Sequence, residues 1–300
     1  MSDKFTVNIP ATSANLGACF DFAGIAVPGL YNTVEAQLSN GQNIITIEGI
    51  GADTIPKNEN NLIYRTFKRT FEYAKKRCPY VKMHCINRIP LNRGLGSSAA
   101  AALGGIFVAN KMMSGALSND DMLKIACEFE GHPDNAAPAI YGGAVVTSYI
   151  NGEPIIRHIK LPKDIAVAVA VPEIMLPTSV SRAVLPESYP RSSVVRAMST
   201  AALAVNALAE GDYELMGKLI MQDVVHQPYR KSLITGYDDV VNAALAGGAF
   251  GCVISGAGST MISYCKDANT AESVKNAMVN AFTSNNVRAS GFSGVIKSSV

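Results

Sequence analysis

Residues 90–101, Pro-Leu-Asn-Arg-Gly-Leu-Gly-Ser-Ser-Ala-Ala-Ala, combine glycines, hydroxyls and the start of a helix in one short segment. Gly94 and Gly96 allow close backbone approach, and the alanines after Ser98 propagate a helix. Amides at a helix N-terminus are unpaired and carry the positive end of the helix dipole, so the segment can hold a polyphosphate. The alternative is a tight turn capped by Ser97 or Ser98. No Gly-Lys-Ser or Gly-Lys-Thr follows, which excludes a Walker P-loop.

Further oxygen-bearing side chains follow this segment. Magnesium keeps several waters and takes one or two protein oxygens, which Ser98 and Glu130 can supply. Glu130 ends a predicted helix, where the dipole disfavours a carboxylate, so it is either a surface glutamate or one that a cation compensates. Asp134 and Asn135 stand in His132-Pro-Asp-Asn, which taken alone is an ordinary turn sequence in a Pro-containing loop.

The composition is that of a folded protein without a strong charge. The chain has 300 residues, of which 48% are hydrophobic and 17% charged, and its formal net charge is +2. This is enough apolar surface for one large or two medium domains. The longest basic run, 75–77, fits a solvated helix face better than a nucleic-acid patch.

The cysteine pattern and the apolar stretches bear on the cellular compartment of the protein. The six cysteines form no Cys-x-x-Cys pair, so we expect them to be reduced and mostly buried, as in a cytoplasmic protein. The N-terminus lacks the pattern of a signal peptide, and the apolar stretches are too short or too interrupted to cross a bilayer. We therefore expect neither a nucleic-acid partner nor a membrane.

Hydrophobic periodicity predicts an α+β fold. Its strands and helices must bring these candidate residues together. The apolar run 165–171 is typical of a strand covered on both faces. A domain boundary is expected near residue 155, giving domains 1–155 and 156–300. The predicted strands are 5–9, 33–38, 44–48, 82–87, 144–149, 155–159, 165–171, a region within 249–264, and 287–292. The predicted helices are 61–76, 97–113, 119–130, 192–210, 213–224 and 270–283.

Three ordered segments together resemble the motifs of the GHMP kinases, a family of small-molecule kinases. They are the glycine-rich segment above, Pro10-Ala-Thr-Ser-Ala-Asn-Leu-Gly-Ala-Cys-Phe-Asp21, and Ile254-Ser-Gly-Ala-Gly-Ser-Thr260. The second of these and the segment 130–143 are most similar to the homoserine kinase branch. The resemblance implies the two-domain GHMP kinase fold, with a ribosomal protein S5 domain 2-like N-terminal domain that binds ATP and a ferredoxin-like C-terminal domain. ATP and substrate would lie in the cleft between them.

The resemblance also implies which residues bind ATP and Mg²⁺. Ser98 and Glu130 match the positions through which the family binds its metal. Asn60 and Leu62 match the segment that lines the adenine pocket. The remaining nucleotide residues implied are Pro90, Arg93, Gly94, Leu95, Gly96, Ser97, Ser98 and Ala99.

The implied substrate site suits an amino acid, because a zwitterion needs an anion for its ammonium group and a cation for its carboxylate. Asp21 supplies the anion, and Arg182 and Arg230 match two arginines that grip the carboxylate. Asn15, Thr178 and Gly256 complete the substrate-binding set. Asp134 and Asn135 are the implied catalytic residues, with Asp134 orienting the hydroxyl or accepting its proton, and His132 is expected to be structural.

The resemblance implies ATP-dependent phosphorylation of the side-chain hydroxyl of homoserine for threonine biosynthesis. Two alternatives are another kinase of the family, acting on mevalonate, threonine or shikimate, and an inactive member that only binds a ligand. The chain departs from the family at Cys19, where glycine is usual, and at 256–259, where Gly-Ala-Gly-Ser replaces Gly-Ser-Gly-Pro. The oligomeric state is left open, with a homodimer as one candidate.

Overall fold

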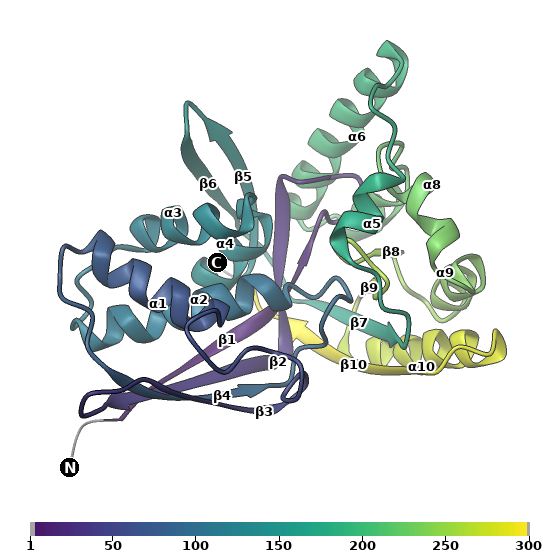
Figure 1. Ribbon diagram of the computed structural model, residues 1–300. Coiled ribbons are helices and arrows are strands. Elements are labelled where there is room, and N and C mark those ends of the chain that lie inside the picture. Colours follow the sequence, from purple (N-terminus) through teal and green to yellow (C-terminus); the bar gives the residue numbers. More distant parts are fainter. Residues whose placement is uncertain (1–3, 299–300) are drawn as a thin grey trace.

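The structure, a computed structural model, describes residues 4–298 and contains two β-sheets in that range (Figure 1). Within the same range the first sheet has six strands in the order β3-β4-β2-β5-β6, with β1 paired to β2. Four helices that include the predicted glycine-rich start pack together beside this sheet. The elements are β1 (Phe5–Ala14), β2 (Ala23–Leu38), β3 (Ile44–Gly49), α1 (Leu62–Tyr73), β4 (Val81–Asn87), α2 (Ser97–Met112), α3 (Asn119–Glu130), α4 (Pro133–Tyr141), β5 (Ala144–Ile150) and β6 (Glu153–Ile159).

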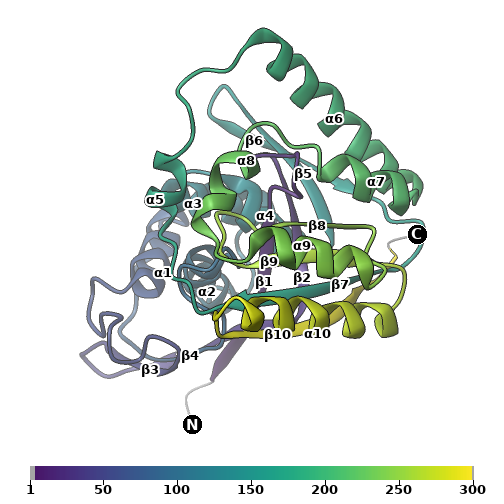
Figure 2. The ribbon, with the colours of Figure 1, turned by 90° about the vertical axis from the view of Figure 1, so that its right-hand side faces the viewer.

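The second sheet, also counted over the described residues, has four strands in the order β10-β7-β9-β8. With α10 between β9 and β10, this is the strand order of a ferredoxin-like domain, as predicted. Figure 2 shows α10 along β7 and β10, which it contacts. The elements are β7 (Ile165–Pro172), α5 (Thr178–Ala183), α6 (Arg191–Glu210), α7 (Tyr213–Ile220), α8 (Gln227–Arg230), a 3₁₀ turn (Lys231–Leu233), α9 (Tyr237–Ala246), β8 (Gly251–Ile254), β9 (Met261–Cys265), α10 (Ala268–Ser284) and β10 (Ala289–Ile296).

Strand β7 joins the two hydrophobic cores of the molecule. All of its residues are buried, and its side chains alternate between the two faces. Val167, Val169 and Val171 belong to the larger core, which extends under the first sheet. The alanines between them, at 166, 168 and 170, belong to a smaller core with Phe282 of α10. The prediction of a doubly covered strand is therefore confirmed.

The β1–β2 hairpin is longer than predicted, because β2 begins at Ala23 rather than near residue 33. Pro28 and Gly29 interrupt the alternation and hide the first half of the strand in the sequence. The ladder shifts register there, so that Pro10 faces Tyr31 while Ala11 faces Val27, and the extra residues form a bulge. Residues 15–22, which include the end of the first motif, connect β1 to β2, so the hairpin fixes their position.

Residues 133–141 form helix α4, so the prediction of a loop around Asp134 and Asn135 was wrong. Proline is well tolerated in the first helical turn, where Pro133 lies, because its missing N–H would be unpaired there anyway. Pro138 cannot donate to the carbonyl of Asp134, and Gly24 of β2 lies against that carbonyl, where a Cβ would come within 2.0 Å. Two prolines in nine residues masked this helix.

Three other differences concern the second half of the chain. Helices α5, α8 and α9 were not predicted, and α7 ends at Ile220 instead of continuing to 224. Residue 155 lies inside β6, and the first sheet ends only at Ile159, so the boundary near 155 stays a prediction. Helix α6 is long and apolar enough, by length and composition alone, to cross a membrane. No helix of this kind was predicted from the sequence. A single helix of this kind is weak evidence, so a membrane role does not follow.

Candidate active site

A cavity of about 330 Å³ is lined by all three motifs and by segments of the second half of the chain. The motifs reach it from the β1–β2 hairpin end, the start of α2 and the loop after β8. Residues 130–135 join them from the end of α3 and the start of α4. Of the predicted site residues, the cavity is lined by Asn15, Asp21, Pro90, Arg93, Gly94, Leu95, Gly96, Ser97, Ser98, Glu130, Asp134, Asn135, Thr178, Arg182, Arg230 and Gly256.

The glycine-rich segment forms an uncapped helix start. Gly96 is the N-cap of α2, with φ +66°, and no side chain caps the helix. The alternative of a turn capped by Ser97 or Ser98 is therefore wrong, and the first-turn amides are left for a ligand. A Cβ at Gly96 would lie 2.0 Å from Oγ1 of Thr12, which shows how closely β1 approaches this turn.

The C-terminal glycine loop supports the same turn. Ser255 Oγ donates to the carbonyl oxygen of Gly94 at 2.6 Å, and the Thr260 amide donates to the carbonyl of Arg93 at 3.1 Å. A Cβ at Gly94 would lie 2.0 Å from the Ser255 carbonyl oxygen. The loop that departs from the family pattern thus packs directly against the glycine-rich segment.

The predicted metal ligands are in contact. Ser98 Oγ donates to Oε1 of Glu130 at 2.6 Å. Burial raises the pKa of Glu130, and the bond from Ser98 opposes that shift. Over residues 4–298 there is no group of three or more His, Cys, Asp or Glu side chains that could hold a metal. A hydroxyl with a single carboxylate beside it fits Mg²⁺, which keeps most of its waters, and does not fit a metal that needs a full protein cage.

Asp134 is a buried carboxylate at the wall of the cavity, in the first turn of α4. Burial raises its pKa from 3.8 to about 6, and Asp21 adds to this, while His132 and Arg182 oppose it. Asp134 is thus a base that can still be ionised at neutral pH and can accept a proton. His132, expected to be structural, is an exposed residue of the cavity lining.

The two arginines of the predicted carboxylate clamp line the cavity, and one of them is paired with Asp21. Nη1 and Nη2 of Arg182 donate to the two carboxylate oxygens of Asp21 at 3.0 and 2.9 Å. Arg230 is only 1% exposed, and burial lowers its pKa to about 10, so it stays charged at neutral pH. The structure thus brings one anion and two guanidinium groups to the same end of the cavity.

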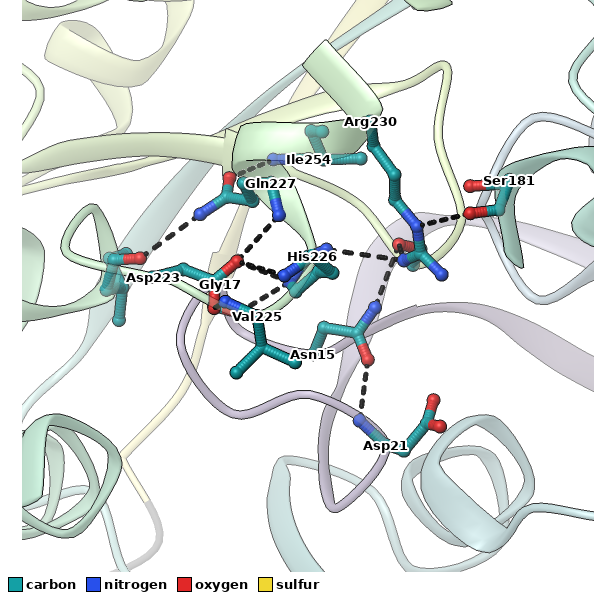
Figure 3. A network of polar contacts seen from close by, with 12 residues as sticks. Asn15, Gly17, Asp21, Ser181, Asp223, Val225, His226, Gln227, Arg230 and Ile254 are labelled. Atoms are coloured by element: carbon teal, nitrogen blue, oxygen red, sulfur yellow. Dashed lines mark hydrogen bonds and ion pairs between the residues drawn. The ribbon is translucent and has the colours of Figure 1, made fainter. Parts of the chain in front are cut away.

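Two predicted asparagines are held by protein groups. Asn15 Nδ2 donates to the carbonyl of Gly256 at 2.8 Å, and its Oδ1 accepts from the amide of Asp21 at 2.9 Å. Figure 3 shows Asn15 beside Asp21, with the bond between them drawn. Asn135 Oδ1 accepts from Oγ1 of Thr12 at 2.9 Å. Both amides therefore fix neighbouring groups of the site.

Three predicted nucleotide residues do not line the cavity. Ala99 is buried in α2, Asn60 is exposed in the loop before α1, and Leu62 is the first residue of α1. Asn60 and Leu62 belong to a local turn that Asn61 caps, so their place is set by α1 and not by the cavity. Their assignment to adenine stays a prediction.

Several residues around the cavity were not predicted from the sequence. Thr12, Phe20 and His226 touch predicted site residues, and Asn92 and Ala257 line the cavity. Thr12, Phe20 and Asn92 stand inside or beside the quoted motifs. His226 precedes Arg230 by one helical turn, a spacing that could have indicated the contact.

Comparison with known proteins identifies the family to which the chain belongs. The family description "GHMP kinases N terminal domain" matches residues 61–143, and "GHMP kinases C terminal" matches residues 204–284. A homoserine kinase of Carboxydothermus hydrogenoformans is 40% identical over 262 residues, covering 87% of this chain and 85% of that protein. One from Trichormus variabilis is 38% identical over 296 residues, covering 98% and 95%.

Solved structures agree as well. The crystal structure of homoserine kinase from Cytophaga hutchinsonii matches with a TM-score of 0.93 and 29% identity, covering 99% of this chain and 96% of that one. Mevalonate kinase of L. major, in complex with R-mevalonate, matches with a TM-score of 0.74 at 14% identity over the whole of both chains, which shows the shared fold alone. The chain belongs to the GHMP kinase family, on its homoserine kinase branch.

Proposed function

We propose that the protein transfers the γ-phosphoryl group of ATP to the side-chain hydroxyl of L-homoserine, giving O-phospho-L-homoserine for threonine biosynthesis in the cytoplasm. One observation carries the proposal: an uncapped helix start and a set of one anion with two guanidinium groups line the same cavity. The first suits a polyphosphate and the second suits a free amino acid. The 36–40% identity to homoserine kinases supports this choice of substrate.

Binding of homoserine would replace an ion pair within the protein by two with the ligand. The substrate ammonium group takes the place of Arg182 beside Asp21, and the substrate carboxylate takes the place of Asp21 beside Arg182. Arg230 supplies the second guanidinium for that carboxylate. Because the exchange keeps each charge paired, the site is satisfied with and without substrate.

Phosphoryl transfer depends mainly on positioning and on charge stabilisation. The first-turn amides of α2 would hold the phosphate oxygens, and Ser98 with Glu130 would hold Mg²⁺. The metal, when bound, neutralises charge on the phosphates. Asp134 would orient the substrate hydroxyl and accept its proton as the oxygen bonds to the γ-phosphorus, while the bond from that phosphorus to the bridging oxygen breaks and ADP leaves. Asn135 would help to place the same hydroxyl.

The test is ADP release by the full-length protein with MgATP and one of four alcohols: homoserine, threonine, shikimate or mevalonate. We expect kcat/KM for homoserine to exceed the others by at least about a hundredfold, since only homoserine offers an amino-acid head group and a primary hydroxyl. Preference for mevalonate or shikimate would refute the amino-acid assignment. ATP binding without turnover of any alcohol would favour an inactive binding protein.

A further inference from the structure

A buried polar cluster lies behind Arg230, outside the groups assigned to the reaction. It consists of Asp223, His226 and Gln227, in and before α8, which are 8%, 0% and 5% exposed (Figure 3). Buried polar side chains in folded proteins are nearly always hydrogen-bonded. The partners of these three residues therefore show what the cluster holds in place.

Asp223 fixes the turn that carries His226. Its carboxylate accepts from the backbone amides of Val225 and His226, each at 2.9 Å, and from that of Gln227 at 2.6 Å. Gln227 in turn accepts from the amide of Ile254, at the end of β8, at 3.0 Å. The turn is thus tied to the second sheet, and His226 has little freedom to move.

The contacts of His226 define its tautomer. Nε2 lies 2.8 Å from the carbonyl oxygen of Gly17, which can only accept, so Nε2 carries the proton. In the neutral ring Nδ1 then has a free lone pair, and Nη1 of Arg230 lies 3.3 Å from it as a donor. Burial lowers the pKa of His226. Asp223, whose Oδ2 lies 3.5 Å from Nε2, raises it, the charge of Arg230 lowers it, and the Gly17 carbonyl and Asp21 raise it. The net shift is downward, which favours the neutral ring.

The remaining contacts of Arg230 leave one edge of its guanidinium unused. Nε donates to the carbonyl of Ser181 at 3.0 Å, and Nη1 also contacts the carbonyl of Gly256 at 3.2 Å. Nη2 has no hydrogen-bond partner among residues 4–298, and Figure 3 shows it without a contact. Because Arg230 lines the cavity, Nη2 is the donor available to a ligand.

Phe20 supports the same arrangement from the first motif. Its ring stacks on the His226 ring, with centroids 5.1 Å apart and an interplanar angle of 27°. The guanidinium carbons of Arg230 and Arg182 lie 5.1 and 5.7 Å from its centroid. One aromatic ring is therefore in contact with both clamp arginines and the histidine, and such a ring attracts cations.

We propose that His226 is a positioning residue for the substrate carboxylate: as a neutral acceptor it holds the Arg230 guanidinium so that Nη2 faces the ligand. This rests on the proposed function, in which Arg230 binds the carboxylate of homoserine. His226 itself touches no substrate. Its removal should therefore weaken homoserine binding through Arg230 and leave ATP binding unchanged.

The test uses two substitutions that divide the contacts of the ring between them. Asn at position 226 can place Oδ1 where the ring has Nδ1, and so keeps an acceptor for Arg230. Gln can place its Nε2–H where the ring has Nε2, and so keeps only the donor to Gly17. Both variants lose the stacking on Phe20, which makes each the control for the other. We expect the KM for homoserine to rise about tenfold in His226→Gln and less than threefold in His226→Asn, with kcat and the KM for ATP unchanged.

A double substitution tests whether His226 acts through Arg230. If it does, His226→Gln combined with Arg230→Ala should lower kcat/KM for homoserine no further than Arg230→Ala alone. Additive losses, or equal KM values for the Gln and Asn variants, would overturn the proposal. Failure of the wild-type protein to phosphorylate homoserine would instead refute the proposed function.

A measurement on the wild-type protein does not depend on how the variants fold. The chain has only four histidines, so nitrogen-15 NMR of the imidazole groups can assign His226. At pH 7 we expect a neutral ring protonated at Nε2. A ring protonated at Nδ1, or an imidazolium, would contradict the proposed acceptor role.

Discussion

The two ends of the cavity are built in different ways. The end at the start of α2, where we propose that the phosphates of ATP bind, uses backbone groups from one continuous segment. In this segment Gly94 and Gly96 adopt positive φ, and α2 begins without a side-chain cap. The other end, where we propose that the substrate carboxylate binds, uses side chains from three separate segments, which carry Asp21, Arg182 and Arg230. The first end depends on local conformation, and the second depends on the whole fold.

The two ends also differ in how their charges are satisfied before a ligand binds. No side chain caps the first turn of α2, so its amides are available. At the other end Arg182 and Asp21 are paired through two hydrogen bonds over a sequence separation of 161 residues. We infer that substitutions at the carboxylate end act on one substrate, while changes near the phosphate end act on ATP and Mg²⁺.

The largest effect is expected at Asp134, which lies between the two ends. Asp134→Asn removes the proton acceptor and should lower kcat by about 10² to 10⁴. In the wild-type protein kcat/KM should fall as pH drops through about 6, the raised pKa of this carboxyl, because the protonated form cannot accept the proton. A pH–rate profile and the kcat of the variant check both points. A variant with near wild-type kcat would remove Asp134 from the chemistry.

The same substitution should stabilise the fold. The carboxyl pKa is higher in the folded protein than the ordinary 3.8, so the fold favours the neutral form. The contribution of Asp134 to stability is therefore lost as pH rises from about 4 to about 6, and Asn avoids this loss. At pH 7 we expect the free energy of unfolding of the variant to rise by about 1–3 kcal/mol. Urea unfolding at pH 4 and pH 7 measures it, and a stabilisation that is not larger at pH 7 would contradict the burial argument.

The next largest effect is expected at the carboxylate end. Arg182→Ala and Arg230→Ala each remove a charge-assisted contact, and kcat/KM for homoserine should fall by about 30- to 1,000-fold, or 2–4 kcal/mol. The KM for ATP should barely move. Lys in place of either arginine should recover only part of the loss, since an ammonium group lacks the planar fork. Arg196→Ala, an exposed residue that pairs with Gln222, is the control for loss of an arginine.

A smaller effect is expected for Glu130→Gln, which is nearly isosteric and removes the carboxylate charge. The Mg²⁺ concentration for half-maximal rate should rise by about tenfold, while the KM for homoserine stays close to wild type. Glu128→Gln, two residues earlier on α3 and paired with Arg69, is the matched control. An unchanged magnesium requirement in Glu130→Gln would rule out Glu130 as a ligand.

The smallest effect is expected for Thr12→Val, which keeps the side-chain shape and removes the hydroxyl. Asn135 then loses its donor at 2.9 Å, and kcat should fall by about 2- to 10-fold, the value of one neutral hydrogen bond. Steady-state kinetics and a melting curve check this. A loss as large as that of Asp134→Asn would show that Thr12 acts in some way other than by holding Asn135.

The sequence predicted most where the signal is local. Helix α3 was predicted over 119–130, its observed bounds, and in the structure Ser118 and Asp121 form a capping box at its start. Strand β7 showed its two covered faces in its unbroken apolar run. Helix α4 was missed because its prolines resemble loop residues, and its packing against Gly24 of β2 is a contact that the local sequence does not show.

The clamp could be named only through the resemblance to a family. Nothing local to Arg182 shows that it meets Asp21, since the two segments come together only when both sheets have formed. The start of α2 at Ser97 was predicted correctly, and the alternative of a turn capped by Ser97 or Ser98 is wrong because Gly96, with its positive φ, is the N-cap. Residues that support the site from outside the cavity lining, such as Phe20, gave no signal of their own, since one aromatic side chain in a loop has many explanations.

The central claim is that this cavity selects its substrate by the amino-acid carboxylate, and a substrate comparison tests it most directly. The measurement is kcat/KM for homoserine and for 3-amino-1-propanol, which keeps the ammonium group and the hydroxyl but lacks the carboxylate, in the wild-type protein and in Arg182→Ala. We expect the substitution to lower the value for homoserine by at least about thirtyfold and that for 3-amino-1-propanol by less than about threefold. Equal losses for the two substrates would contradict the carboxylate clamp.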